Sequence, residues 1–163
     1  MLLYIGVAVW PLVIQWIYLN RPFSLSGKLI NRNKYILIAV LPIFVLLAFR
    51  SAGMGADTGI YMRHFIEMIN TPLERALENS RMELGYLIFV KVITYFTQDP
   101  LIYQVICVTI MFIGLYSFLK QLQDDDPFLF LYFYCTLGLF FFMFTGTRQC
   151  LAMSICLFSY KYV

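Results

Sequence analysis

Long apolar runs, separated by short polar stretches, dominate the chain. Four of them approach or reach the roughly 20 residues that a helix needs to cross a bilayer, namely Leu2–Leu19, Tyr35–Phe49, Leu101–Leu119 and Phe128–Phe144. A fifth run starts near Gln149 and is still apolar at Val163. The pattern predicts an all-α, multi-pass transmembrane protein. We expect residues 1–163 to form a single membrane domain and to be a fragment of a longer polytopic chain.

A shorter apolar run, Leu84–Thr97, carries Lys91. It is a short span, a re-entrant segment or an interfacial helix, and its lysine either snorkels or faces a polar cavity. If this run crosses the bilayer, Arg148 faces the cytoplasm. If it does not, Lys120 and Lys161 lie inside and Arg148 lies outside. We prefer the second arrangement because it retains more cations on the cytoplasmic side.

The polar segments set the orientation of the first two helices. The loop Asn20–Lys34 contains four basic residues and no acidic one. Short basic loops stay in the cytoplasm. We therefore expect the N-terminus to face out and the long loop Arg50–Glu83 to be extracytoplasmic.

This long loop carries helical patterns of its own. Apolar side chains recur at i, i+4, i+7 and i+8, which is one face of a helix, at Tyr61, Phe65, Met68 and Ile69. The order Thr71-Pro72-Leu73-Glu74 is typical of a capping box with proline at the first helical position, and it predicts a second helix from Pro72 to about Asn79. We expect both amphipathic helices to lie on the membrane, apolar side down.

Composition agrees with a membrane protein. Hydrophobic residues make up 61% of the chain and charged residues 13%, with a mean hydropathy of +0.77. Soluble domains are nearer half apolar and a quarter charged. The 16 Phe and 12 Tyr fit lipid-facing and interfacial positions. The net charge of +3 comes from one basic loop, so no nucleic-acid partner is expected.

No metal or cofactor is expected either. The four cysteines lie in apolar runs without metal-ligand spacing, which favours buried free thiols. The run Asp124-Asp125-Asp126 has no further acidic or histidine neighbour, and a solvated loop explains it better than a metal site. His64 is the only histidine. The sequence lacks a G-x-S-x-G motif and a phosphate-binding glycine loop.

Three polar clusters at the ends of apolar runs are candidates for chemistry. In the first, Gly53 and Gly55 precede Asp57 and Thr58. Either these glycines allow close approach of a ligand to the backbone, or they end one helix and Asp57 caps the next. Both can hold together, since a cap fixes the carboxylate in place.

The other two clusters each contain one charged residue. Arg148, in Thr145–Gln149, is costly in an apolar helix unless it is paired or functional. Its planar fork suits a phosphate or carboxylate, and the alternative is an arginine that snorkels at a helix end. Glu83 opens the run Leu84–Thr97, where it is either functional or only a favourable charge at a helix N-terminus.

Taken in order, these clusters resemble the EpsG family of polysaccharide polymerases, which is related in role to Wzy-type polymerases. The resemblance spans nearly the whole chain. The matching stretches are Ala48-Phe49-Arg50 with Gly55-Ala56-Asp57-Thr58 and Tyr61, Glu83-Leu84-Gly85-Tyr86, Gln98-Asp99-Pro100, and Gly146-Thr147-Arg148-Gln149 with Ala152.

The resemblance implies an activity. Such a protein joins sugar repeat units carried on polyprenyl diphosphate into an exopolysaccharide, capsule or O-antigen, at the outer face of the bacterial plasma (inner) membrane. Its expected partners are the lipid-linked oligosaccharide, membrane lipid, and proteins of polysaccharide export or chain-length control. The implied catalytic residues are Asp57, Arg148 and Glu83, and the implied substrate-binding residues are Arg50, Thr58, Tyr61 and Gln149.

The alternative class is a non-enzymatic polytopic protein, such as a transporter component or an assembly subunit of polysaccharide export. A transporter would place ionisable groups at mid-bilayer on several helices. Here the ionisable groups lie mostly at the outer ends of the helices, with Lys91 as the exception. A membrane acyltransferase is a weaker alternative, because it would use a histidine-based site and His64 stands alone.

Overall fold

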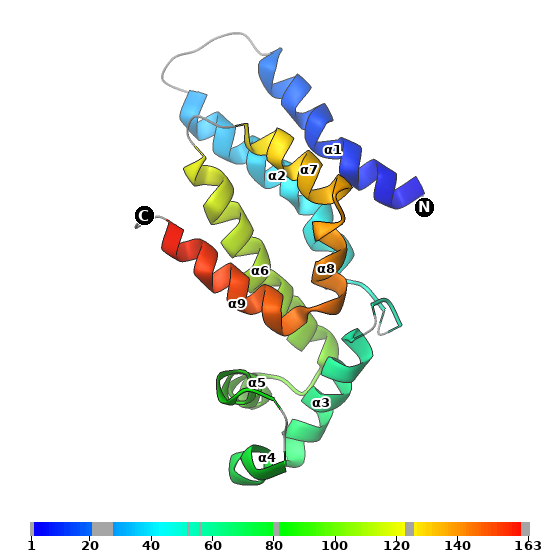
Figure 1. Ribbon diagram of the computed structural model, residues 1–163, viewed down its shortest axis with the longest axis vertical. Coiled ribbons are helices and arrows are strands. Elements are labelled where there is room, and N and C mark those ends of the chain that lie inside the picture. The colour runs from blue at the N-terminus through cyan, green and yellow to red at the C-terminus, as the bar shows by residue number, and fades with distance from the viewer. Residues whose placement is uncertain are drawn as a thin grey trace.

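The computed structural model describes residues 2–20, 28–51, 53–55, 57–79, 82–122 and 126–160, and within these ranges the chain is helical with no strand (Figure 1). The elements are α1 Leu2–Leu19, α2 Lys28–Ala48, α3 Thr58–Asn70, α4 Leu73–Asn79, α5 Leu84–Phe96, α6 Pro100–Gln121, α7 Pro127–Thr136, α8 Leu139–Thr145 and α9 Thr147–Ser159. The predicted all-α fold class is confirmed for these ranges. Residues 21–27 of the predicted basic loop Asn20–Lys34 lie outside the described residues. The rest of that loop, from Lys28, is not a loop but the start of α2.

By length and composition, α6 is the one described helix that could cross a bilayer by itself. A second candidate span exists if α7 and α8 are counted together, although a bend of 62° separates them. α5 and most of α1 are apolar but shorter. The number of crossings therefore stays a prediction.

The bend between α7 and α8 corrects one expectation. The sequence predicted a single helix over Phe128–Phe144, but the structure interrupts it at Leu137 and Gly138. Gly138 has φ +82°, in the left-handed region that glycine adopts without steric cost. This turn redirects α8, whose C-terminus then reaches the residues that precede α3.

Five of the helices form two groups that share α2 (Figure 1). In the first, α1 packs against α2 and α7, and in the second, α6 packs between α2 and α9. Gly114 permits a close crossing of α6 and α9, because a Cβ at this position would lie 2.8 Å from the Ser154 Cβ. Small residues commonly allow such approaches between apolar helices.

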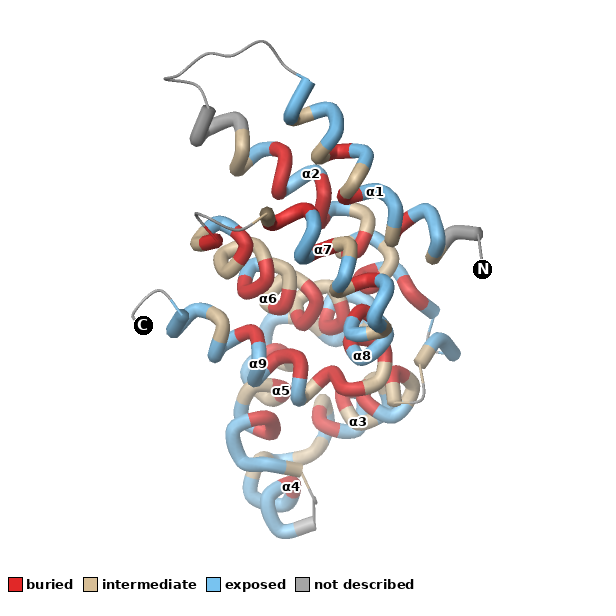
Figure 2. The backbone as a smooth tube through the Cα atoms, turned by 45° about the horizontal axis from the view of Figure 1, so that its top comes forward, coloured by how far each residue is buried: buried red, intermediate tan, exposed pale blue. Residues whose placement is uncertain are grey.

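Burial follows this arrangement (Figure 2). The sides of α2, α6 and α9 that face one another are buried, whereas their outer sides carry exposed apolar side chains. On α2, for example, Leu41 is 48% exposed, and on α9 Ile155 is 63% exposed. Extended apolar surfaces of this kind are typical of faces that contact lipid or another protein.

The helices of the long loop are present, but α3 does not use its apolar face as expected. Tyr61, Phe65 and Met68 are buried, and α3 packs against α5 and α6. The Phe65 ring stacks on Tyr103 with centroids 4.6 Å apart. The expectation that this face lies on the membrane is therefore wrong for α3, because the protein itself buries it.

Lys91 has a role that the sequence did not indicate. Its Nζ donates to the carbonyl of Met68 at 2.9 Å and to that of Thr71 at 2.8 Å. A lysine here satisfies carbonyls at the C-terminus of α3 and complements its dipole. Thr71 also closes α3, donating to the Glu67 carbonyl, and α4 begins at Leu73, one residue after the predicted start.

Two aspartates cap the helices that follow them. Asp99 accepts from the backbone N–H of Leu101 at 2.8 Å, and Asp126 accepts from those of Phe128 and Leu129. Asp126 also accepts a hydrogen bond from Gln15 Nε2, which links α7 to α1. Asp124 and Asp125 lie outside the described residues, so the predicted solvated loop stays a prediction for them.

Candidate functional site

The polar clusters that the sequence singled out meet at one place. They lie at the end of α2 and at the starts of α3, α5 and α9, and the end of α8 completes the site (Figure 1). Hydrogen bonds from Arg50 and Thr58 reach α8 and α9, and hydrogen bonds from Arg148 reach α3 and the residue before α5. Segments up to 97 residues apart in the chain thus form one site.

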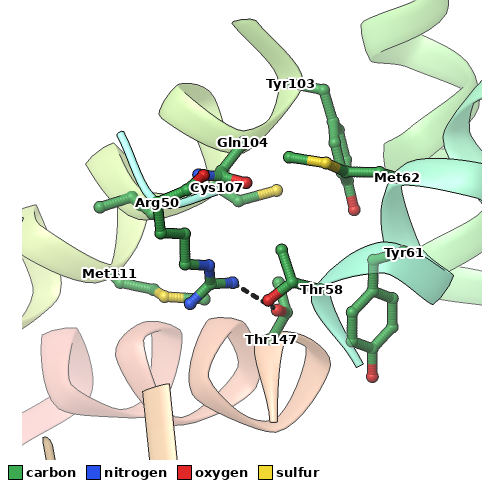
Figure 3. Close-up of a pocket in the computed structure, with 10 residues that line it drawn as sticks. Arg50, Thr58, Tyr61, Met62, Tyr103, Gln104, Cys107, Met111 and Thr147 are labelled. Atoms are coloured by element: carbon green, nitrogen blue, oxygen red, sulfur yellow. Dashed lines mark hydrogen bonds between the residues drawn. The ribbon is translucent and has the colours of Figure 1, made fainter. Parts of the chain in front are cut away.

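Arg50 lies at the buried bottom of this site, with 7% of its surface exposed. Its Nη1 donates to the Met143 carbonyl at 2.8 Å. Its Nη2 donates to Thr147 Oγ1 at 3.4 Å (Figure 3). The guanidinium also lies 5.4 Å from the centre of the Phe144 ring. Burial lowers the pKa of Arg50, but an arginine keeps its charge in proteins. No described carboxylate forms an ion pair with it.

The segment before α3 closes the end of α8. Thr58 Oγ1 donates to the Phe144 carbonyl at 3.2 Å. Gly55 has φ +91°, and a Cβ there would lie 2.2 Å from the same carbonyl oxygen. Helix ends leave carbonyls without intrahelical partners. Arg50 and Thr58, which the resemblance assigned to substrate binding, therefore satisfy the last carbonyls of α8 in this structure.

Asp57 directly precedes α3 but does not cap it. Its side chain makes no capping hydrogen bond, unlike Asp99 and Asp126, which cap α6 and α7. The side chain is partly exposed. Because the Asp57 carboxylate makes no hydrogen bond to the helix, it is available for another partner. The interpretation of Asp57 as a helix cap alone is therefore wrong.

Arg148 is held by two other parts of the chain. Its Nη1 donates to Glu83 Oε2 at 2.5 Å, and its Nε donates to the Tyr61 hydroxyl at 3.1 Å. The guanidinium carbon lies 5.9 Å from the ring centre of Tyr61 and 6.0 Å from that of Tyr86. The side chain is 29% exposed. Arg148 is thus held by polar and aromatic partners of α3 and the start of α5.

Glu83 lies at the N-cap position of α5, although its side chain makes no capping hydrogen bond. The backbone N–H of Glu83 and then Arg148 hydrogen-bond its carboxylate, and both lower its pKa. The carboxylate is therefore charged at neutral pH, and 71% of the side chain is exposed. Among the described residues this is the one ion pair.

Gln149 and His64 lie at the edge of the site. Gln149 is exposed, and its amide oxygen is folded towards Gly146, 2.6 Å from where a Cβ would stand. His64 Nδ1 is buried without a hydrogen-bond partner among the described residues, and burial lowers the pKa of His64.

No group of three potential metal ligands occurs in the described ranges.

Sequence reasoning missed two supporting residues. Gln104 Nε2 donates to the carbonyls of Leu47, Ala48 and Arg50, which closes α2 and fixes the Arg50 backbone. The second missed residue is Tyr103 of α6, whose hydroxyl lies 2.5 Å from that of Tyr86. Gln104 could have been found from the sequence, because it lies inside the apolar run Leu101–Leu119. A polar side chain in a predicted span is costly unless it is paired or functional.

Comparison with known proteins agrees with the motif analysis. A sequence model of the EpsG family matches residues 33–163, which is most of the chain and includes every residue of the site. Comparisons with curated proteins and with solved structures gave no match. The resemblance stated from the motifs is confirmed, and the chain belongs to the EpsG family.

Proposed function

We propose that this chain belongs to a membrane polysaccharide polymerase that joins sugar repeat units carried on polyprenyl diphosphate, at the outer face of the bacterial inner membrane. Membership of the EpsG family supports this proposal. The observation that carries it is the gathering of Arg148, Glu83 and the segment Asp57–Tyr61 on one partly exposed site. A charged carboxylate and a fixed guanidinium are the groups that this reaction requires.

The reaction places two demands on the protein. A hydroxyl oxygen of the acceptor sugar attacks the anomeric carbon of the donor, forming the new glycosidic C–O bond as the bond to the diphosphate oxygen breaks. The hydroxyl proton must pass to a base, for which a carboxylate is suited. The lipid diphosphate leaves with the bonding electron pair, and fixed cations stabilise the charge that develops on it.

Asp57 and Arg148 are the residues that we assign to these demands. Asp57 is the base, or orients the acceptor hydroxyl, because its carboxylate is not used as a helix cap. Arg148 binds the diphosphate, since a guanidinium presents two parallel N–H donors to phosphate oxygens. Tyr61 aims Arg148 through the bond to Nε, and Arg50 and Thr58 hold the α8–α9 junction on which Arg148 is mounted.

Glu83 then has two states. In the structure it bonds to Arg148 Nη1. Exposed ion pairs of this kind contribute little net stability, so a diphosphate with several charged oxygens can replace the single carboxylate. The released Glu83, still next to the site, is placed to bind sugar hydroxyls together with the exposed amide of Gln149.

Substitution of Asp57 by Asn tests the proposal in cells whose only copy is the full-length protein. Asn has nearly the same shape as Asp, and the Asp57 side chain makes no capping hydrogen bond that could be lost, so Asp57→Asn removes the base and keeps the local fold. We expect loss of the polymer at an unchanged protein level. Asp99→Asn is the matched control: Asp99 is used as a helix cap, and its variant should make normal polymer. Normal polymer from Asp57→Asn would contradict the proposal for this residue.

A further inference from the structure

The outer side of α5 carries a row of exposed apolar side chains. The inner side of the helix is buried, and α5 packs chiefly against α3 and α4. Along the outer side, large apolar residues recur at i, i+4, i+8, i+11 and i+12, which is one face of a helix. These residues, which we call the α5 stripe, are Leu84, Ile88, Val92, Tyr95 and Phe96. Tyr95 and Phe96, at 78% and 83%, are the most exposed large hydrophobic residues in the described ranges.

The α5 stripe contains no charged residue, although the helix does. Lys91 lies on the inner side, because its Nζ donates to the carbonyls of Met68 and Thr71 at the end of α3. The neighbouring helices α3 and α4 carry the exposed charged side chains instead, which are Arg63, Glu67, Glu74, Arg75 and Glu78. Charged and apolar surfaces are thus separated in this part of the fold, as they are in proteins that rest one side on a bilayer.

The length and position of α5 limit how it can meet a bilayer. Its 13 residues make a helix about 20 Å long, which is shorter than the hydrocarbon core of roughly 30 Å. Only three residues separate it from α6, the described helix that is long and apolar enough to cross by itself. From Phe96 to Pro100 the extended chain covers at most about 14 Å. The end of α5 therefore lies close to the level at which α6 would enter the bilayer.

The direction of α5 differs from that of α6. In Figure 1, α6 and α9 are seen from the side, whereas α5 is seen nearly along its axis. If α6 crosses the bilayer, α5 therefore runs along the bilayer surface. Figure 1 also shows α4 on the side of α5 that faces away from α6 and α9. The α5 stripe, which is opposite to the side that packs on α3 and α4, is thus turned towards the level of the long apolar helices.

An aromatic residue of another helix lies at the same end of α6. Phe49 directly follows α2 and is 65% exposed. The end of α2 lies beside the first turns of α6, because Gln104 Nε2 donates to its last carbonyls. Phe49, Tyr95 and Phe96 are therefore exposed aromatic residues at one end of the α2–α6 pair. Aromatic side chains are enriched at this level of membrane proteins, where apolar helices meet the headgroups.

We propose that α5 is an interfacial helix, which lies in the surface of the bilayer with the α5 stripe in contact with lipid acyl chains. This assignment requires α6 to cross the bilayer, and it selects one of the three possibilities that the apolar run Leu84–Thr97 left open. Glu83 and Arg148, at the start of α5, then lie at the level of the lipid headgroups. The diphosphate of a lipid-linked substrate lies at that level too, a consequence that rests on the proposed function, whereas the lipid contact itself does not.

Spin-label accessibility in the full-length protein tests the lipid contact. The protein is reconstituted in vesicles of phosphatidylethanolamine and phosphatidylglycerol, in a background without reactive cysteines, and carries one nitroxide at Ile88→Cys. Matched controls are Ile113→Cys, half-exposed in the middle of α6, and Glu78→Cys, exposed on α4. We expect the labels at 88 and 113 to be relaxed by oxygen, which dissolves in lipid, and the label at 78 by a water-soluble nickel chelate.

Two outcomes at position 88 would overturn the proposal. Relaxation by the nickel chelate, as at position 78, would place the α5 stripe in water. Relaxation by neither reagent would show that protein covers the stripe, either another part of the chain or a second copy. A label at position 113 that responds to the nickel chelate would also overturn it, because α6 would then not cross the bilayer.

The same measurement along the helix distinguishes an interfacial helix from a short span. The ratio of the two relaxation effects reports depth, and labels at Leu84→Cys, Ile88→Cys and Val92→Cys sample two turns of the stripe. A helix that crosses the bilayer would change depth by about 12 Å between positions 84 and 92. We expect nearly equal depths, and a steady change approaching that value would contradict the proposal. No substrate is present, so these outcomes are independent of the polymer assay with Asp57→Asn.

Discussion

Arg148 and Glu83 form an ion pair of 2.5 Å between Nη1 and Oε2, although 65 residues separate them in the chain. The pair joins the start of α9 to the start of α5. Because Arg148 also bonds to Tyr61 of α3, three helix N-termini are fixed relative to one another at the candidate site. Its geometry therefore depends on the packing of the whole loop region against α6 and α9.

The ion pair predicts a pH dependence of stability. The pKa of Glu83 is lowered by its own backbone N–H and by Arg148. The carboxylate therefore stabilises the fold at pH values above the pKa of a free glutamate, about 4.3, and loses this contribution as the pH falls through the lower folded-state pKa. We expect wild type to melt above Glu83→Gln at pH 7, with a difference that shrinks towards pH 3. A difference that stays constant with pH would contradict the pairing.

A second prediction concerns the contact between Gly55 and α8. Gly55→Ala should destabilise the protein by more than about 1 kcal/mol, because a Cβ is unfavourable in this backbone conformation and would lie 2.2 Å from the Phe144 carbonyl oxygen. Thermal melting of the purified protein measures this. Gly53→Ala is the matched control, since a Cβ there meets nothing within 4 Å. Equal melting temperatures for the two variants would show that the segment before α3 does not dock on α8.

The sequence predicted much of the helical structure and singled out polar clusters that the fold brings together, because both follow from local patterns. The 3.6-residue spacing of Tyr61, Phe65 and Met68 identified the buried face of α3. It could not identify what covers that face, since lipid and protein select the same apolar residues. The break at Gly138 was missed for a related reason: the runs on both sides are uniformly apolar, and one glycine in such a run does not reveal a positive φ.

The polar contacts of the site were harder to foresee. Asp99 and Asp57 are both aspartates that directly precede a helix, a position that suits a cap. The sequence separates them only by the proline that follows Asp99 and not Asp57. Lys91 and Gln104 bond to carbonyls of segments 20 to 57 residues away. Such partners are set by tertiary packing, and no periodicity in the chain encodes them.

A third prediction concerns orientation in the membrane. The proposal requires α3, α4 and the start of α5 to be extracytoplasmic and the start of α2 to be cytoplasmic. Lys34 and Glu78 are both exposed, so each can carry a single cysteine in a full-length background without the native ones. An impermeant thiol reagent added to intact cells should label Glu78→Cys and leave Lys34→Cys unlabelled. The opposite pattern would place the site in the wrong compartment for lipid-linked repeat units.

The central claim is that Arg148 binds the diphosphate of the lipid-linked substrate, and Arg148→Lys tests it most directly. Lysine keeps the charge and the apolar stem but cannot present two parallel N–H donors. The measurement is polymer chain length together with the pool of lipid-linked repeat units, in cells that make the full-length variant at the wild-type level. We predict that polymer is largely lost and that the lipid-linked units accumulate. Wild-type chain lengths with an unchanged pool would contradict the account, because a charge on a long stem would then be all that position 148 supplies.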